Sequence, residues 1–260
     1  MTSTDTRSEA GAQSSIVHED RYRPVLANQH ASPTLRAIYQ DVYGADYPAE
    51  VDPFGFVTLA DLRCFAEFLE PSEVTRLLDI GCGRGGPGLW VARELGASLT
   101  GVDVVPEAVT EAARLAESFE DAPPAVFHAA SATGTGLPEG AYDGAMSVDA
   151  LWMVLDKPAA FAELARLLTP GSPLIFTTWA PPHLDYAWFL EPAGFEDIVT
   201  EEITGSAERQ LAVYERICGA RDVLAREMGE EAARVLADEA ADAPRLLATV
   251  PRVVISAFRS

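Results

Sequence analysis

Short apolar runs alternate along this chain with longer segments in which apolar residues recur every three or four positions. The strands expected from these runs and from the order of elements lie at Thr75–Ile80, Leu99–Asp103, Ala125–His128, Ala141–Val148, Leu174–Trp179, Glu196–Glu202 and Arg252–Phe258. The helical spacing is found in Gly55–Glu70, in residues 106–119 and in Lys157–Leu168. Strands that alternate with helices are typical of α/β proteins, in which crossover helices cover a mostly parallel sheet. The pattern therefore predicts an α/β core.

Two segments before the core depart from this alternation. Residues 1–17 are rich in Ser, Thr, Ala and Gly and have no apolar period, so we expect a disordered leader. Residues 18–54 carry one expected helix, near Thr34–Val42, and an unusual density of aromatic side chains. We interpret them as an N-terminal cap segment, whose aromatic residues either face a ligand or fasten the leader to the core.

A third segment, residues 207–248, interrupts the core before its last strand. It carries two expected helices, of which the second covers Glu230–Ala240. The first has an apolar stripe formed by Leu211, Tyr214, Cys218, Leu224 and Met228. This helical insertion would form a lid over a pocket or a dimer surface, and the chain would be a monomer or a homodimer. The core is then residues 55–206 together with 249–260.

Composition and charge narrow the class of protein. The chain has 260 residues, of which 48% are hydrophobic, enough for one α/β domain with a sizeable core and a subdomain. A net charge of −21 disfavours nucleic acid and anionic membranes as partners. No apolar run is long enough to span a membrane and no signal peptide is visible, which predicts a cytoplasmic protein. Three widely spaced cysteines form no metal-ligand pair and indicate a reducing compartment.

The strongest candidate for chemistry is a glycine-rich turn after the first strand, with glycines at positions 81, 83, 85, 86 and 88. A strand, a glycine turn and a helix N-terminus form a nucleotide-type binding site. Asp103 ends the second strand about 20 residues after the turn, where a carboxylate binds ribose hydroxyls. Asp79, two residues before Gly81, would repel a pyrophosphate but attract an amino group. The two acids therefore favour an adenosine joined to a zwitterionic amino acid over a dinucleotide.

At these residues the chain resembles the class I S-adenosylmethionine-dependent methyltransferases. Their first motif is an acidic residue, an apolar residue and Gly-x-Gly-x-Gly, matched here by Asp79–Gly85, and their second acidic position falls on Asp103. The resemblance covers residues 56–203 and a last strand near the C-terminus. It implies a Rossmann-like, doubly wound, mostly parallel seven-stranded sheet, with the N-terminal cap and with the helical insertion before the last strand.

The resemblance also implies a cofactor, S-adenosylmethionine, with S-adenosylhomocysteine as its product, and no metal. Asp79 would hold the methionine ammonium group and Asp103 the ribose. A Ser131-Ala132 pair stands where the family usually places Asp-Ala beside the adenine, so the hydroxyl remains but the charge is missing. The full set of expected cofactor residues is Asp79, Gly81, Cys82, Gly83, Gly85, Asp103, Val104, Ser131, Ala132 and Ser147.

The acceptor is expected to lie beside residues 147–153, at the C-terminal end of the fourth strand, where many relatives have a histidine and this chain has Trp152 and Met153. The full set of expected acceptor contacts is Tyr22, Tyr39, Trp152, Met153 and Trp179. Two residues are candidate general bases. His183 follows the fifth strand with Asp185 nearby, and the alternative interpretation is an exposed loop histidine without a catalytic role. Asp149 ends the fourth strand, but it would also suit the N-cap of a short helix.

These expectations describe a methyltransferase that acts on a small-molecule, secondary-metabolite acceptor by direct displacement at an oxygen, nitrogen or carbon. Three alternatives stay open at this point. One is a cyclase or isomerase that binds the sulfonium cofactor without transferring its methyl group. A nicotinamide-dependent oxidoreductase is disfavoured by Asp79, and the third alternative is a cofactor-binding partner without activity of its own.

Overall fold

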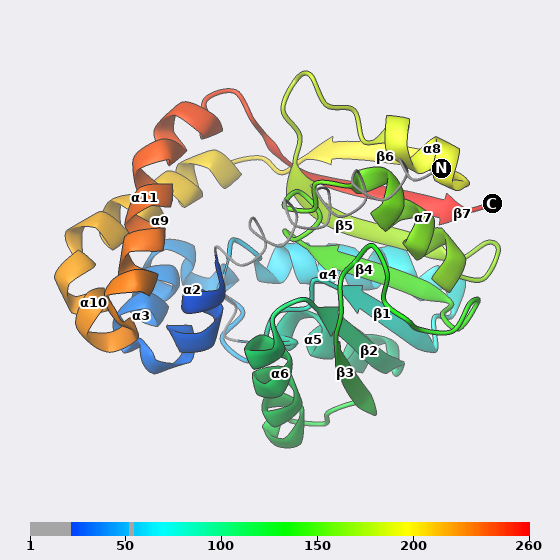
Figure 1. Ribbon diagram of the computed structural model, residues 1–260, viewed down its shortest axis with the longest axis horizontal. Coiled ribbons are helices and arrows are strands. Elements are labelled where there is room, and N and C mark those ends of the chain that lie inside the picture. The colour runs from blue at the N-terminus through cyan, green and yellow to red at the C-terminus, as the bar shows by residue number, and fades with distance from the viewer. Residues whose placement is uncertain (1–21, 52–54) are drawn as a thin grey trace, which may run out of the picture.

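A seven-stranded sheet forms the centre of the protein in the computed structural model, which describes residues 22–51 and 55–260 (Figure 1). The strands are β1 (Arg76–Ile80), β2 (Ser98–Asp103), β3 (Ala125–Ala129), β4 (Gly144–Val148), β5 (Pro173–Trp179), β6 (Phe195–Glu202) and β7 (Arg252–Arg259). They are arranged in the order β3-β2-β1-β4-β5-β7-β6, and β7 is antiparallel to both of its neighbours. The sheet reverses its winding beside β1, which confirms the doubly wound, mostly parallel fold that the sequence predicts.

Helices cover both faces of this sheet. On one face α4 (Leu59–Leu69), α5 (Gly86–Leu95) and α6 (Pro106–Ser118) pack over side chains such as Leu77 and Met146. On the other, α7 (Lys157–Leu167) and α8 (Ala187–Ala193) cover Leu78, Phe176 and their neighbours. Because adjacent side chains of a strand point to opposite faces, strands covered on both sides read as continuous apolar runs. That is why the strands are visible in the sequence.

Helix starts follow local capping chemistry. Thr58 accepts a hydrogen bond from the backbone N–H of Asp61, whose carboxylate accepts one from the N–H of Thr58 in return. This capping box begins α4 at Leu59, so the helix expected from Gly55 starts four residues later than its apolar spacing suggests.

The remaining helices form a separate layer beside the C-terminal ends of the parallel strands (Figure 1). It consists of α2 (Arg23–Asn28), α3 (Pro33–Tyr43), α9 (Ser206–Gly219), α10 (Arg221–Met228) and α11 (Glu230–Leu247), which share an apolar core of their own. Thus the expected cap segment contains α2 as well as the predicted helix near Thr34–Val42. The expected leader, residues 18–21 and residues 52–54 lie outside the described residues.

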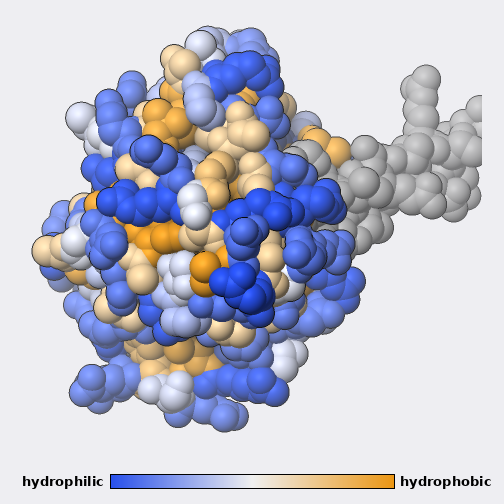
Figure 2. Space-filling view, turned by 90° about the vertical axis from the view of Figure 1, so that its left-hand side faces the viewer, coloured by the Kyte–Doolittle hydropathy of each residue, from blue (hydrophilic) through white to orange (hydrophobic). Residues whose placement is uncertain are grey.

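The insertion differs in detail from the two helices expected. Ala220 separates α9 from α10, and α11 continues through Pro244 to Leu247. The expected stripe is also partly wrong, because Leu211 and Cys218 are exposed while Val213 and Ile217 are buried beside Tyr214. Hydrophilic side chains cover most of the outer face of this layer, with apolar ones between them (Figure 2). No helix within the described ranges has the length and apolarity that a membrane span requires.

Candidate active site

A cavity of about 510 Å³ lies between the helical layer and the C-terminal ends of the parallel strands. This is the edge at which open α/β sheets bind ligands, and the volume is in the usual range for a small-molecule site. Its lining divides into a polar part, formed by the glycine turn with Asp79 and Asp103, and a larger aromatic and aliphatic part contributed by the helical layer and by the segments that follow β4 and β5.

The glycine turn depends on backbone conformations that favour glycine. Gly81, Gly83 and Gly85 have φ values of +72°, +52° and +78°. A Cβ atom on Gly81 would overlap the side chain of Ala150, in the loop after β4. The N–H groups of Gly81 and Cys82 both donate to the carbonyl of Val102 in β2, which anchors the start of the turn. The turn is therefore shaped to bring backbone close to a ligand.

Asp103 braces the same turn. Its Oδ2 accepts a hydrogen bond from the N–H of Gly83 at 2.8 Å, and its Oδ1 accepts one from the N–H of Val105 at 2.9 Å. Burial raises the pKa of this carboxyl, and the hydrogen bonds from Val105 and Gly83 oppose that effect. A carboxylate has about four acceptor positions, so both oxygens can still accept a ligand hydroxyl.

Asp79 is the more unusual acid. Its residue is only 1% exposed, and its Oδ1 accepts no hydrogen bond from the described residues. Burial, followed by the negative charge of Asp103, raises the pKa of Asp79 to about 8. Glycine at position 88 leaves room for this carboxylate, whose Oδ2 lies 2.5 Å from where a Cβ would stand. A buried carboxyl without a partner is costly unless a cation accompanies it. The arrangement therefore fits the ammonium group of S-adenosylmethionine.

The other expected cofactor residues are distributed unevenly. Gly81, Cys82 and Gly83 line the cavity with the two acids, whereas Gly85, Val104, Ser131, Ala132 and Ser147 are not part of its lining. The Ser131 hydroxyl lies 3.0 Å from that of Thr133, and Ser147 is fully buried. Roles for these five residues stay predictions.

The aromatic part of the cavity contains all five expected acceptor contacts, Tyr22, Tyr39, Trp152, Met153 and Trp179. The rings of Trp152 and Trp179 lie 5.5 Å apart, centroid to centroid, and Phe56 packs edge-on against Trp179. Tyr214 donates a hydrogen bond to Glu239 at 2.7 Å. Burial, with the charge of Glu239, raises the pKa of Tyr214, so its phenol stays neutral. This wall is apolar and pre-formed.

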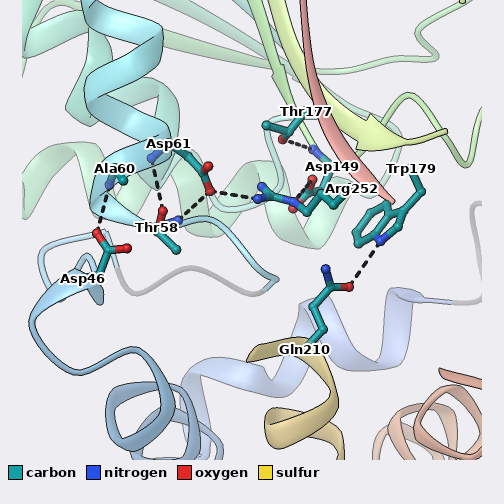
Figure 3. A network of polar contacts seen from close by, with 9 residues as sticks. All are labelled: Asp46, Thr58, Ala60, Asp61, Asp149, Thr177, Trp179, Gln210 and Arg252. Carbon is teal, nitrogen blue, oxygen red and sulfur yellow. Dashed lines mark hydrogen bonds and ion pairs between the residues drawn. The ribbon is translucent and has the colours of Figure 1, made fainter. Parts of the chain in front are cut away.

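Asp149 lies at the boundary between the two parts, held by a buried ion pair (Figure 3). Its Oδ1 accepts from Nε of Arg252 at 2.9 Å, and Nη1 of Arg252 donates to Asp61 at 2.9 Å. Burial alone would lower the pKa of Arg252, but the two carboxylates raise it. No α-helix follows Asp149, and its side chain binds Arg252 rather than a helix N-terminus, so the N-cap interpretation is wrong. Its Oδ2 is buried without a hydrogen bond from the described residues.

His183 lies at the exposed rim of the cavity. The carboxylate of Asp185 accepts a hydrogen bond from the backbone N–H of Ala187, at the start of α8. No hydrogen bond joins His183 to Asp185 in the part of the chain that the structure describes. The residue is close to the site but has no orienting partner there.

Three polar residues of this region were not predicted from the sequence: Gln210, Asp61 and Arg252. Gln210, on α9, accepts a hydrogen bond from Nε1 of Trp179 at 3.2 Å. The sequence indicates for Asp61 only a role in helix capping, as the third residue of a capping box. A signal for Arg252 did exist, because an arginine opening an otherwise apolar strand needs a buried acid as its partner.

Comparisons with known proteins agree with this geometry. Residues 78–176 match the family model described as a methyltransferase domain. Methyltransferase GfsG of Streptomyces halstedii is 26% identical over 77% of this chain and 81% of its own length. Phosphoethanolamine N-methyltransferase 3 of Arabidopsis thaliana is 26% identical over 58% of this chain, which spans only 35% of that longer protein. The crystal structure of the [4+2]-cyclase SpnF has the same fold, with a TM-score of 0.67 at 24% identity over 76% of this chain and 79% of its own.

Over its core the chain is similar to the class I S-adenosylmethionine-dependent methyltransferases, and it is an S-adenosylmethionine-dependent methyltransferase that acts on small molecules. Among the described residues no group of histidine, cysteine, aspartate and glutamate side chains is arranged to hold a metal ion.

Proposed function

We propose that the enzyme methylates a neutral, largely apolar small molecule of secondary metabolism by direct displacement at the cofactor's methyl carbon. The observation that carries this proposal is Asp79, a buried carboxyl whose Oδ1 accepts no hydrogen bond from the described residues, in a cavity whose lining is otherwise largely apolar. The cofactor supplies the activated methyl group. The protein binds the cofactor and the acceptor, orients them toward each other and excludes water.

Residues of the polar part would hold the cofactor. Asp79 binds the methionine ammonium group, the backbone of residues 81–85 lies beneath the amino acid and ribose, and Asp103 accepts from the ribose hydroxyls. Ser131 is the candidate for the adenine edge, although the cavity lining supports its role less than that of the two acids.

The charges around the cavity disfavour an anionic acceptor. The described lining contains five carboxylates, those of Asp79, Asp103, Asp149, Glu239 and Asp242. Its one lysine or arginine is Arg84, on the glycine turn. The plant relative, by its name, methylates a phosphorylated amine, and an anionic group of that kind would be repelled here.

Helices α9 and α11 form the lid of the cavity in this proposal. Tyr214, Leu236 and Leu246 from these helices line the aromatic part, so acceptor and donor would react away from bulk water. Asp149 is the stronger candidate for a base, because it is buried beside the cofactor turn and has one oxygen without a hydrogen bond, whereas His183 is exposed at the rim.

The test uses methyl-labelled S-adenosylmethionine and a panel of neutral hydroxylated aromatic and aliphatic compounds. We expect S-adenosylhomocysteine and methylated product to accumulate in equal amounts. A cyclase or isomerase on the same scaffold would instead convert a substrate without changing its mass and without consuming the cofactor. Failure of S-adenosylhomocysteine to bind, measured by calorimetry, would remove the cofactor from the proposal altogether.

A further inference from the structure

Gln210 is a buried amide with one half of its hydrogen-bonding capacity in use. The residue is 1% exposed, and its Oε1 accepts from Nε1 of Trp179 at 3.2 Å. Because indole is only a donor, this contact fixes the orientation of the amide and makes Nε2 the free end. Nε2 is buried and donates no hydrogen bond to the described residues.

The packing around Gln210 favours an apolar residue at that position. Its neighbours in the cavity lining include Trp179, Tyr214 and Ile217. An unpaired amide donor among such side chains destabilises the fold. A ligand that accepts a hydrogen bond from Nε2 removes this cost.

Asp149 presents the complementary atom in the same cavity. Arg252 occupies its Oδ1, and Oδ2 is buried without a hydrogen bond from the described residues. Gln210 comes from α9 and Asp149 from the loop after β4, and both line the cavity. Figure 3 shows the amide nitrogen of Gln210 on the side that faces Asp149 and Arg252. One buried donor and one buried acceptor, neither of which has a hydrogen bond among the described residues, therefore line the same cavity.

We propose that Gln210 and Asp149 together bind a hydroxyl group of the acceptor, and that this oxygen is the atom methylated. The inference rests on the proposed function and narrows it to O-methylation. The hydroxyl donates its proton to Oδ2 of Asp149 and accepts the Nε2 hydrogen of Gln210 on one lone pair. Its second lone pair remains for attack on the methyl carbon.

Other acceptor atoms do not fit both contacts. A neutral amine has one lone pair, which cannot accept from Gln210 and attack the methyl group at the same time. A carbon nucleophile has no lone pair for the amide, and a carboxylate or phosphate has no proton to donate to Asp149. The pair therefore selects a hydroxyl.

The step balances as follows. The hydroxyl oxygen forms a bond to the methyl carbon while the carbon–sulfur bond breaks, and the electron pair of that bond neutralises the sulfonium to give S-adenosylhomocysteine. The hydroxyl proton moves to the Asp149 carboxylate, which later releases it to water. No metal, oxidant or further reactant is needed.

The experiment measures ligand binding to the protein loaded with S-adenosylhomocysteine. The probes are a bicyclic phenol, 2-naphthol, and its counterparts 2-methylnaphthalene and 2-methoxynaphthalene. We expect the phenol to bind at least tenfold more tightly than either counterpart. Gln210→Leu should abolish this preference, as should Gln210→Glu, which keeps the shape and the Trp179 contact but removes the donor. Gln40→Leu, on the exposed side of α3, should leave it unchanged.

Two results overturn the inference: a phenol that binds no better than its counterparts, or a preference that survives both Gln210 variants. Transfer of label to nitrogen or carbon in a wild-type assay overturns it as well, while leaving the methyltransferase proposal intact. Loss of S-adenosylhomocysteine binding in the wild type is the separate result that refutes the proposed function.

Discussion

Arg252 donates through Nε to Oδ1 of Asp149 at 2.9 Å, inside the protein and beside the cavity. The same guanidinium group reaches Asp61 at the start of α4 through Nη1. One buried cation thus ties β7 to the loop after β4 and to the start of α4 (Figure 3). Two acids can remain buried here because each has a charged partner.

We therefore expect Arg252→Met to lower the free energy of unfolding by about 3–5 kcal/mol, because it leaves two buried carboxylates without their partner. Urea unfolding followed by circular dichroism measures the change. The exposed pair of Arg234 and Asp238 supplies the control, and Arg234→Met should cost less than about 1 kcal/mol. If both variants lose the same free energy of unfolding, the buried ion pair stabilises the fold no more than the exposed one.

Asp79 gives a prediction about pH. Its pKa is about 8 in the folded protein and near 3.8 in the unfolded chain, so between these values the folded state holds a proton that the unfolded state releases. The free energy of unfolding therefore falls as pH rises through this window and levels off above about pH 8. The wild type should lose about 3 kcal/mol between pH 6 and pH 9 through this group, and Asp79→Asn should not show that loss.

The same variant should bind S-adenosylhomocysteine at least tenfold more weakly at pH 7.5, because the Asp79 carboxyl can lose its proton when the ammonium group binds, whereas an amide cannot supply the negative charge. Thermal unfolding without cofactor at the two pH values and calorimetry provide the measurements. If the variant is more stable than the wild type at high pH but binds S-adenosylhomocysteine equally well, Asp79 is a buried acid that does not hold the cofactor.

Asp103 gives a third prediction. We expect Asp103→Ala to weaken S-adenosylhomocysteine binding by about tenfold or more, because it removes the bonds to Gly83 and Val105 as well as the proposed ribose contact. Asp143→Ala is the matched control. Asp143 also accepts two backbone N–H bonds, from Thr75 and Arg76, but at the opposite end of β1. It should reduce stability without changing the affinity measured by calorimetry.

Some of this site could be predicted from the sequence and some could not, for a physical reason. The glycine turn could be predicted together with Asp79 and Asp103, because these residues lie close in sequence to two strands with clear apolar runs. The contacts of Arg252 instead join residues 103 and 191 positions apart, and only the folded sheet brings them together. No sequence pattern pointed to Gln210, because its contact with Trp179 exists only once α9 packs against the end of β5.

The choice between the two candidate bases is testable directly. Asp149→Asn should lower kcat by about 100-fold or more while S-adenosylhomocysteine still binds, because an amide cannot take the acceptor proton. We expect less than about tenfold loss for His183→Ala, since this exposed side chain has no orienting partner among the described residues. The reverse order of effects in a label-transfer assay would assign the base to His183.

Substitutions at Gly81 and Gly83 distinguish two effects, the strain of a positive φ and the steric overlap of an added Cβ. Both have positive φ, but a Cβ at Gly81 would overlap Ala150, whereas one at Gly83 would meet nothing within 4 Å. Gly83→Ala should therefore cost only the backbone strain, about 1–2 kcal/mol of unfolding free energy. Gly81→Ala adds a steric conflict with the loop that carries Asp149, so it should cost more and also weaken S-adenosylhomocysteine binding. Urea unfolding and calorimetry on the two variants distinguish these effects, and equal losses would show that the contact with Ala150 yields easily.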